Sequence, residues 1–188
     1  MTKSEIRKAA LRQRRTLSRE DVTTLSFRLL AQFSTLDFSE VRTIHLFIPI
    51  EEKNEPDTFL FIEWLTLNHP EIKIIVPRAD FDTALMTHHQ YTHKDDLQKN
   101  MYNILEPAAS NGYHGHIDLV LVPLLAFDLR GYRVGYGKGF YDRYLSRCRP
   151  DVLKIGVSFF EAESLIDDVN EHDIPLNYCV TPQNIYVF

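Results

Sequence analysis

Short apolar runs separated by longer amphipathic segments constrain the fold of this chain more than any other feature. Strands of this kind, with helical segments between them, are typical of a largely parallel sheet that is covered on both faces. The sequence therefore predicts a three-layer α/β fold with a mostly parallel central sheet and helices on both faces, as a single domain over residues 1–188. Buried strands are predicted over residues 41–49, 72–77, 117–123, 153–160 and 184–188.

Helices are predicted from composition and from capping signals. Residues 3–15 lack Gly and Pro and are rich in good helix formers. Ser18 is a candidate N-cap for a second helix, whose apolar residues recur at helical spacing. A third helix is predicted to have Pro56 in an early position, and residues 140–145 read as a fourth. The polar region that follows the second strand predicts only a hairpin or strand pair, around residues 85–91.

Charge and cysteine content narrow the class of protein. A net charge of −5 argues against general nucleic-acid binding, and no apolar run approaches the ~18 residues of a membrane span. Cys148 and Cys179 have no metal-binding spacing, so we expect reduced thiols in a cytoplasmic protein. No obvious apolar stripe is left over in the sequence, so we expect a monomer. Residues 1–19 hold seven Lys or Arg against one acid, Glu5. On charge alone, this segment fits a transit peptide, a solvated helix face or a contact to an anionic ligand.

Glycine is concentrated in "GYRVGYGKGFYDRYL", residues 131–145, which hold four of the seven glycines of the chain. The stretch has neither the GxxxxGK[ST] nor the GxGxxG pattern. Alternating glycines at 135, 137 and 139 nevertheless let the backbone approach a ligand closely and turn successive N–H groups into one anion-binding concavity. A following helix start would add further N–H donors. An ordinary Gly/Tyr turn remains the alternative reading of the spacing.

Charged side chains within this stretch favour a phosphate ligand. Arg suits bidentate contact with phosphate oxygens, and Lys138 adds a mobile positive charge between Arg133 and Arg143. Asp142 supplies a hard oxygen ligand beside these cations, as Mg²⁺ bound to a polyphosphate requires. The histidines of residues 88–93 and 114–116 have no repeated metal-ligand spacing.

A family resemblance supports this reading. "VPLLAFDLRGYRVGYGKGFYDRYL", residues 122–145, is similar to the signature of the 5-formyltetrahydrofolate cyclo-ligase family, also called methenyltetrahydrofolate synthetase. The resemblance implies ATP- and Mg²⁺-dependent conversion of 5-formyltetrahydrofolate to 5,10-methenyltetrahydrofolate with release of ADP and phosphate. It also makes the basic N-terminus part of the enzyme rather than a transit peptide. Further matches are Lys3 and Arg7, "EPDT" at 55–58, "ILEP" at 104–107 and "NEHD" at 170–173.

The resemblance also implies residue roles. Lys138 and Arg133 become the catalytic candidates, with Lys138 stabilising charge on the transferring phosphoryl group. Asp142 and Asp173 become candidate Mg²⁺ ligands. The implied ATP-binding residues are Lys3, Arg7, Arg133, Val134, Gly135, Tyr136, Gly137, Lys138, Gly139, Phe140 and Tyr141, and the implied folate-binding residues are Arg7, Ile50, Glu55, Tyr102, Tyr136 and Phe140.

Two other functions and two departures from the family pattern stay open. The chain fits a nucleotide- or folate-binding relative without turnover, and by fold analogy alone a sugar-phosphate isomerase or CoA-transferase. Glu163 stands where the family often has Gln, and this change would alter hydrogen bonding near the nucleotide. Thr181-Pro182 stands where a Thr-Glu pair is common, which bears on the last strand.

Overall fold

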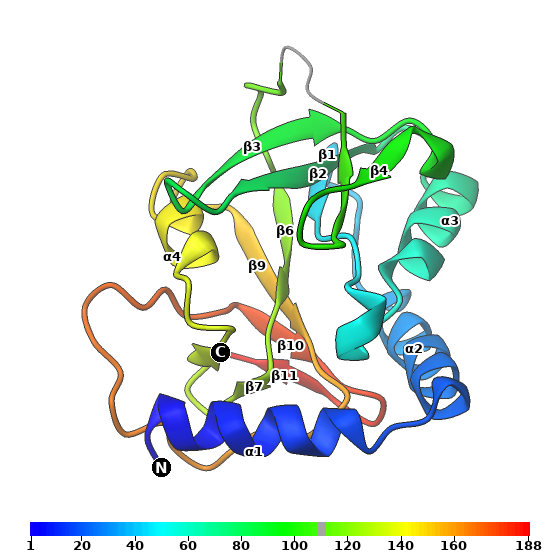
Figure 1. Cartoon of the computed structure of the whole chain (residues 1–188). Coiled ribbons are helices and arrows are strands. Elements are labelled where there is room, and N and C mark those ends of the chain that lie inside the picture. Colours follow the sequence, from blue (N-terminus) through cyan, green and yellow to red (C-terminus); the bar gives the residue numbers. More distant parts are fainter. Residues whose placement is uncertain (109–111) are drawn as a thin grey trace.

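Seven strands form the central sheet of the structure, a computed structural model that describes residues 1–108 and 112–188. The strands are β1 (Thr43–Leu46), β2 (Lys73–Asp80), β3 (Leu85–Gln90), β6 (Leu119–Pro123), β9 (Leu153–Val157), β10 (Tyr178–Val180) and β11 (Ile185–Val187). Their order is β11-β10-β9-β6-β1-β2-β3 (Figure 1). The inner strands run parallel, and β3 and β11 pair antiparallel at the two edges.

Four α-helices and two small hairpins complete the described part of the chain. The helices are α1 (Lys3–Arg15), α2 (Arg19–Phe33), α3 (Thr58–Asn68) and α4 (Phe140–Leu145), with short 3-10 turns η1 (Glu51–Lys53) and η2 (Lys94–Asp96). The hairpins are β4 (Leu97–Lys99) with β5 (Leu105–Pro107), and β7 (Ala126–Phe127) with β8 (Arg133–Val134). None of these helices is both long and apolar enough to cross a bilayer.

Capping explains where the first helices begin. Thr2 and Glu5 form a reciprocal capping box at the start of α1. Ser18 does the same with Asp21 at the start of α2, which confirms its predicted role as N-cap. The prediction that Pro56 stands early in the third helix is wrong, because the side chain of Asp57 caps α3 and Pro56 therefore precedes it.

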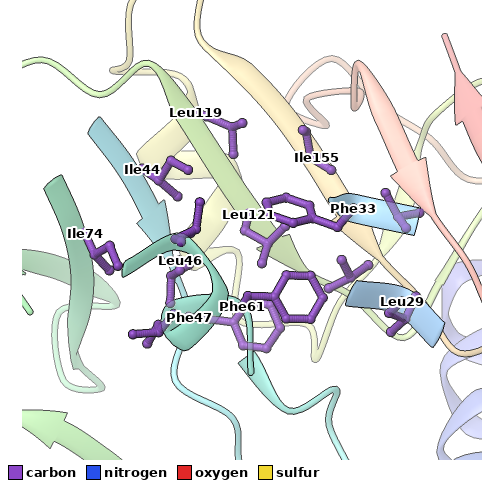
Figure 2. Packing of buried hydrophobic residues seen from close by; sticks show 14 of the residues in the cluster. Leu29, Phe33, Ile44, Leu46, Phe47, Phe61, Ile74, Leu119, Leu121 and Ile155 are labelled. Carbon is purple, nitrogen blue, oxygen red and sulfur yellow. The ribbon is translucent and has the colours of Figure 1, made fainter. Parts of the chain in front are cut away.

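The two faces of the sheet carry different helices. In β6, Leu119 and Leu121 point into the cluster that α2 and α3 cover (Figure 2). Val120 and Val122 point to the other face, where they pack with Leu145 of α4. Successive strand residues face opposite ways, so the near-continuous apolar run of β6 fills both layers. The predicted three-layer α/β fold with a mostly parallel sheet is confirmed.

Helix α1 lies across the carboxyl ends of the parallel strands (Figure 1). Its residues Ile6 and Ala10 pack with Leu125 and Val134, which belong to the β6–β7 turn and to β8. This third cluster fixes α1 beside the glycine-rich stretch. It therefore brings the basic N-terminal segment to the end of the sheet where ligands collect in open α/β folds.

The predicted edge hairpin is confirmed, whereas one inner strand lay outside the predictions. β3 pairs antiparallel with β2 from Leu85 to Gln90. β10 has only the residues Tyr178 to Val180, which are too few for alternation to be visible. Its position is set by parallel pairing with β9 rather than by its own pattern.

Candidate active site

A cleft of about 580 Å³ opens where the parallel strands end. Its walls include Phe47, which directly follows β1, and Pro123, which ends β6. Ligand sites favour this position in open α/β sheets. Most of the predicted site residues line this cleft, namely Lys3, Arg7, Ile50, Glu55, Arg133, Gly135, Tyr136, Gly137, Lys138, Gly139, Phe140, Tyr141, Asp142 and Asp173.

Two predicted site residues do not line the cleft. The side chain of Val134 is 1% exposed and packs in the cluster beneath α1. Tyr102 is 53% exposed, and its ring lies 4.4 Å from the ring of Phe81. Phe81 does line the cleft, and its ring lies 5.4 Å from that of Phe140. Tyr102 thus reaches the cleft wall through Phe81.

Two glycines of the glycine-rich segment (residues 135–139) have conformations that other residues rarely adopt. Gly137 has φ 89° and Gly139 has φ 70°, both in the left-handed region. A Cβ atom at Gly139 would lie 2.7 Å from Arg143 Nη1, and one at Gly137 would lie 3.3 Å from Arg7 Cζ. A Cβ atom at Gly135 would meet no atom within 4 Å. A side chain would therefore be strained at positions 137 and 139 by the backbone conformation, whereas position 135 has room for a Cβ atom.

Arginines from two helices hold the carbonyl oxygens of the glycine-rich segment. Arg7 Nε in α1 donates to the Gly135 carbonyl at 2.8 Å, and Arg143 Nη2 in α4 donates to the Lys138 carbonyl at 2.5 Å. In the described part of the chain, the main-chain N–H groups of residues 135–142 donate to no protein acceptor. These N–H groups are therefore the donors that the segment has to offer a ligand.

Two ion pairs lie side by side at one wall of the cleft. Arg133 Nη2 donates to Asp142 Oδ1 at 2.7 Å, and Lys3 Nζ lies 2.5 Å from Asp173 Oδ2. The Ile174 N–H also donates to Asp142 Oδ1, at 3.2 Å, which places Asp142 beside the residue that follows Asp173, and both aspartates line the cleft. Burial lowers the pKa of the Arg133 guanidinium, and the charge of Asp142 opposes that shift.

The carboxylates of Asp142 and Asp173 fit a magnesium ion that is shared with phosphates. No cluster of three or more protein ligands suited to a metal occurs among the residues described here. Mg²⁺ does not need one, because it is usually held by one or two carboxylates together with substrate phosphates and water. Both carboxylates line the same cleft as the glycine-rich segment.

Glu55 lies at the centre of a buried hydrogen-bond chain. The Tyr136 hydroxyl donates to Glu55 Oε1 at 2.7 Å, and the Ile50 N–H donates to Oε2 at 2.8 Å. Arg14 Nη1 in turn donates to the Tyr136 hydroxyl at 3.1 Å. Burial raises the pKa of the Glu55 carboxyl, and the bonds from Tyr136 and Ile50 act in the opposite direction.

Three residues of this site lay outside the sequence predictions. Arg14 is 1% exposed. The sequence indicates its burial by spacing alone, because Ile6, Ala10 and Arg14 follow one another at intervals of four residues and therefore share one face of α1. Lys53 Nζ lies 4.3 Å above the ring of Tyr136. Phe81 lies in the polar region that predicted only a hairpin, so no pattern singled it out.

The histidines and Glu163 lie away from the cleft walls. His88 Nδ1 and His45 Nε2 are 3.1 Å apart, and the His88 ring stacks on Tyr144 at 4.2 Å. Burial lowers the pKa of His45 well below its usual value and that of His88 to about 4, so both are neutral at pH 7. The backbone of Glu163 bonds to Phe127 and Leu129 beside the β7–β8 hairpin.

A family model and a curated relative match most of the chain. The model described as the 5-formyltetrahydrofolate cyclo-ligase family matches residues 1–182. A 5-formyltetrahydrofolate cyclo-ligase from Mycoplasma pneumoniae is 34% identical over 164 residues, which cover 85% of this chain and 86% of that protein.

Solved structures agree with this match. The NMR structure of Aquifex aeolicus 5,10-methenyltetrahydrofolate synthetase has a TM-score of 0.80 and 34% identity, and the match covers 100% of this chain and 93% of that chain. A 5,10-methenyltetrahydrofolate synthetase from Mycoplasma pneumoniae has a TM-score of 0.72 and 26% identity over 96% of this chain and 98% of that one. The glycine-rich cleft, the matching fold and the relatives lead to one conclusion: the chain belongs to the 5-formyltetrahydrofolate cyclo-ligase family of enzymes.

Proposed function

We propose that this protein uses ATP and Mg²⁺ to cyclise 5-formyltetrahydrofolate to 5,10-methenyltetrahydrofolate, with release of ADP and phosphate. The observation that carries the proposal is the shared cleft. One cavity holds the glycine-rich segment with Lys138 and also the buried carboxylate of Glu55. Such a cavity suits a triphosphate beside a flat, hydrogen-bonding heterocycle.

The triphosphate would lie against the glycine-rich segment. Its N–H groups at residues 135–142 supply donors to phosphate oxygens. Arg7 and Arg143 hydrogen-bond to the carbonyl oxygens of the segment and so hold them away from the phosphates. Lys3, Arg7 and Arg133 bring positive charge to the same cleft. The exposed side chain of Lys138 can follow the γ-phosphoryl group, because it is held by no ion pair among the described residues.

Mg²⁺ would be held by Asp142 and Asp173 together with phosphate oxygens. When bound, it offsets the phosphate charge during phosphoryl transfer. Asp142 and Asp173 now pair with Arg133 and Lys3, so both cations can turn to the nucleotide when the carboxylates take the metal.

The chemistry needs phosphoryl activation because a formamide oxygen is a poor leaving group. The formyl oxygen attacks the γ-phosphorus, the bond to ADP breaks, and an iminium phosphate forms. N10 of the folate then attacks the formyl carbon, N10 loses its proton, and phosphate departs with the former formyl oxygen. The residues position the reactants and stabilise charge, and no side chain acts as a nucleophile.

The pterin would lie near Glu55. The Glu55 carboxylate accepts hydrogen bonds from N–H groups of the ring, Ile50 packs beside it, and the rings of Tyr136 and Phe140 offer apolar faces. Tyr102 contributes by packing against Phe81 in the cleft wall.

A binding relative without turnover is the second candidate function. An absorbance assay separates the two. The protein is mixed with 5-formyltetrahydrofolate and Mg²⁺, with and without ATP, and the near-ultraviolet absorption of the methenyl product is followed. Product that forms only with ATP supports the enzyme. Binding of either substrate without product supports the relative.

Several further expectations remain proposals. These are a monomeric protein, one functional domain over residues 1–188, a cytoplasmic location and no nucleic-acid ligand. Size-exclusion chromatography with light scattering tests the first of them directly.

A further inference from the structure

We propose that Arg14 is a positioning residue for the folate: it acts through the Tyr136 hydroxyl to fix the Glu55 carboxylate that receives the pterin. The inference rests on the proposed function for the identity of the ligand. The chain of contacts, from Arg14 to Tyr136 to Glu55, is independent of it.

Arg14 is the largest fully buried side chain in the described part of the protein. A buried guanidinium is strongly disfavoured unless it is paired and hydrogen-bonded. Here Nη2 donates to the Leu124 carbonyl at 2.6 Å and Nη1 donates to the Tyr136 hydroxyl at 3.1 Å. The negative charge that compensates Arg14 is that of Glu55, one hydroxyl group away. Arg14 is thus tied to the ligand-binding carboxylate by charge as well as by hydrogen bonds.

The guanidinium fixes the direction of the hydrogen bonds. Arginine has donors but no acceptor, so the Tyr136 oxygen must accept from Arg14. The hydroxyl hydrogen is then directed to Glu55 Oε1, while the Ile50 N–H binds Oε2. Both carboxylate oxygens are therefore anchored in one orientation. Their remaining lone pairs can face the N–H groups of a ligand in the cleft.

The main chain of Arg14 also supports the loop that carries Glu55. Asn54 Nδ2 donates to the carbonyl oxygens of Arg14 and Leu17, each at 3.0 Å. Asn54 itself has φ 48°, a left-handed conformation that needs support from its surroundings. The last turn of α1 thus fixes the loop residue next to Glu55 through its backbone, and the carboxylate itself through the Arg14 side chain.

A purely structural role for Arg14 predicts different behaviour from a positioning role. Loss of packing alone would lower stability and would weaken the binding of both substrates to the same extent. Loss of positioning would remove a positive charge that favours the ionised carboxylate, so the pKa of Glu55 would rise further. It would also weaken folate binding more than ATP binding, because ATP is assigned to the glycine-rich segment.

The first experiment is a ¹³C-NMR titration of the Glu55 carboxyl in protein labelled at glutamate, with Glu55→Gln for assignment. We expect Arg14→Gln to raise the pKa of Glu55, and Arg14→Lys to restore part of the wild-type value. Arg15→Gln, an exposed neighbour on α1, is the matched control and leaves the titration unchanged. An unchanged titration in Arg14→Gln would overturn the inference.

The second experiment measures both KM values. We expect Arg14→Gln to raise KM for 5-formyltetrahydrofolate about tenfold, the loss of one hydrogen bond to a charged group, with KM for ATP changed less than about twofold. Ala10→Gly, buried on the same helix and outside the cleft, is the control for lost helix stability and shifts neither KM selectively. Equal changes in both KM values would mean a structural role only.

A further variant covers the case in which Arg14→Gln does not fold. Tyr136→Phe keeps Arg14 and its bond to Leu124 and removes only the bridging hydroxyl. We expect the same raised pKa of Glu55 and the same selective rise in KM for the folate. Wild-type values in Tyr136→Phe would overturn the inference. If the wild-type protein neither binds 5-formyltetrahydrofolate nor forms product, the proposed function fails as well. If the wild-type protein forms product and Arg14→Gln behaves like wild type, only the inference about Arg14 fails.

Discussion

Lys3 Nζ lies 2.5 Å from Asp173 Oδ2, which joins the first turn of α1 to the segment before β10. The two residues are 170 positions apart in the sequence. Beside them, Arg133 pairs with Asp142 at 2.7 Å. The cations assigned to phosphates and the carboxylates assigned to Mg²⁺ thus neutralise one another in the protein alone. Nucleotide and metal would bind by exchanging these partners.

The Mg²⁺ requirement should depend on Asp142. We expect Asp142→Asn to raise the Mg²⁺ concentration for half-maximal activity about tenfold, because a neutral amide is a weaker ligand for a hard cation. Titration of activity with MgCl₂ at saturating ATP measures this. Asp151→Asn, which removes an exposed partner of Arg149, serves as the control. The same half-saturation in wild type and Asp142→Asn would exclude the ligand role.

Turnover should depend on Lys138, although the fold should not. The side chain is exposed, so its removal leaves the core intact. We expect Lys138→Ala to lower kcat by about 10²–10³-fold, the usual loss when one group that stabilises transition-state charge is removed. Steady-state kinetics and thermal melting check both statements. Lys8→Ala, exposed on α1, is the control, and a Lys138→Ala enzyme with wild-type kcat would remove Lys138 from the mechanism.

Replacement by alanine should lower stability at one glycine of the same segment and leave it unchanged at another. Gly139→Ala places a Cβ atom 2.7 Å from Arg143 Nη1 at φ 70°, so we expect a loss of about 1–3 kcal/mol in the free energy of unfolding. The Cβ atom of Gly135→Ala meets no protein atom within 4 Å, so we expect wild-type stability. This atom would occupy the space where the triphosphate is proposed to lie, so we expect weaker ATP binding. Denaturant unfolding and calorimetric titration with ATP measure the two effects. Equal stability of the two variants would contradict the geometry.

Stability should fall in mild acid because of the buried His45 and the partly buried His88. His88 has a pKa of about 4 in the folded protein, below its ordinary value of 6.5, and the pKa of His45 is lowered as well. Between pH 6.5 and 4 the unfolded chain therefore binds protons that the folded protein does not. We expect the melting temperature to fall across this window, and His88→Gln to reduce the slope. The same slope in wild type and His88→Gln would contradict this prediction.

Patterns within single segments predicted most of the fold. The apolar runs of β1, β2, β6 and β9 indicated a covered sheet, since their residues are buried on both faces. β10 and the β7–β8 hairpin have three and two residues per strand, which is shorter than any period can reveal. Their conformation comes from pairing with neighbours that are distant in sequence or joined by a tight turn.

The candidate site divides in the same way. The glycine-rich segment and Lys138 could be singled out because their residue types suit a phosphate ligand locally, whereas Glu55 could be named only through the family resemblance. The contacts of Arg14 and Phe81 could not be predicted, because they form only when distant parts of the chain pack together. Arg14 meets a tyrosine 122 positions away, and Phe81 acquires its place between Tyr102 and Phe140 only when the hairpins pack.

Oxygen transfer tests the central claim most directly. 5-Formyltetrahydrofolate labelled with ¹⁸O in the formyl group is incubated with the protein, ATP and Mg²⁺, and the released phosphate is analysed by mass spectrometry. Phosphoryl activation at this cleft predicts one ¹⁸O atom in each phosphate released with the methenyl product. Methenyl product accompanied by unlabelled phosphate would contradict the account.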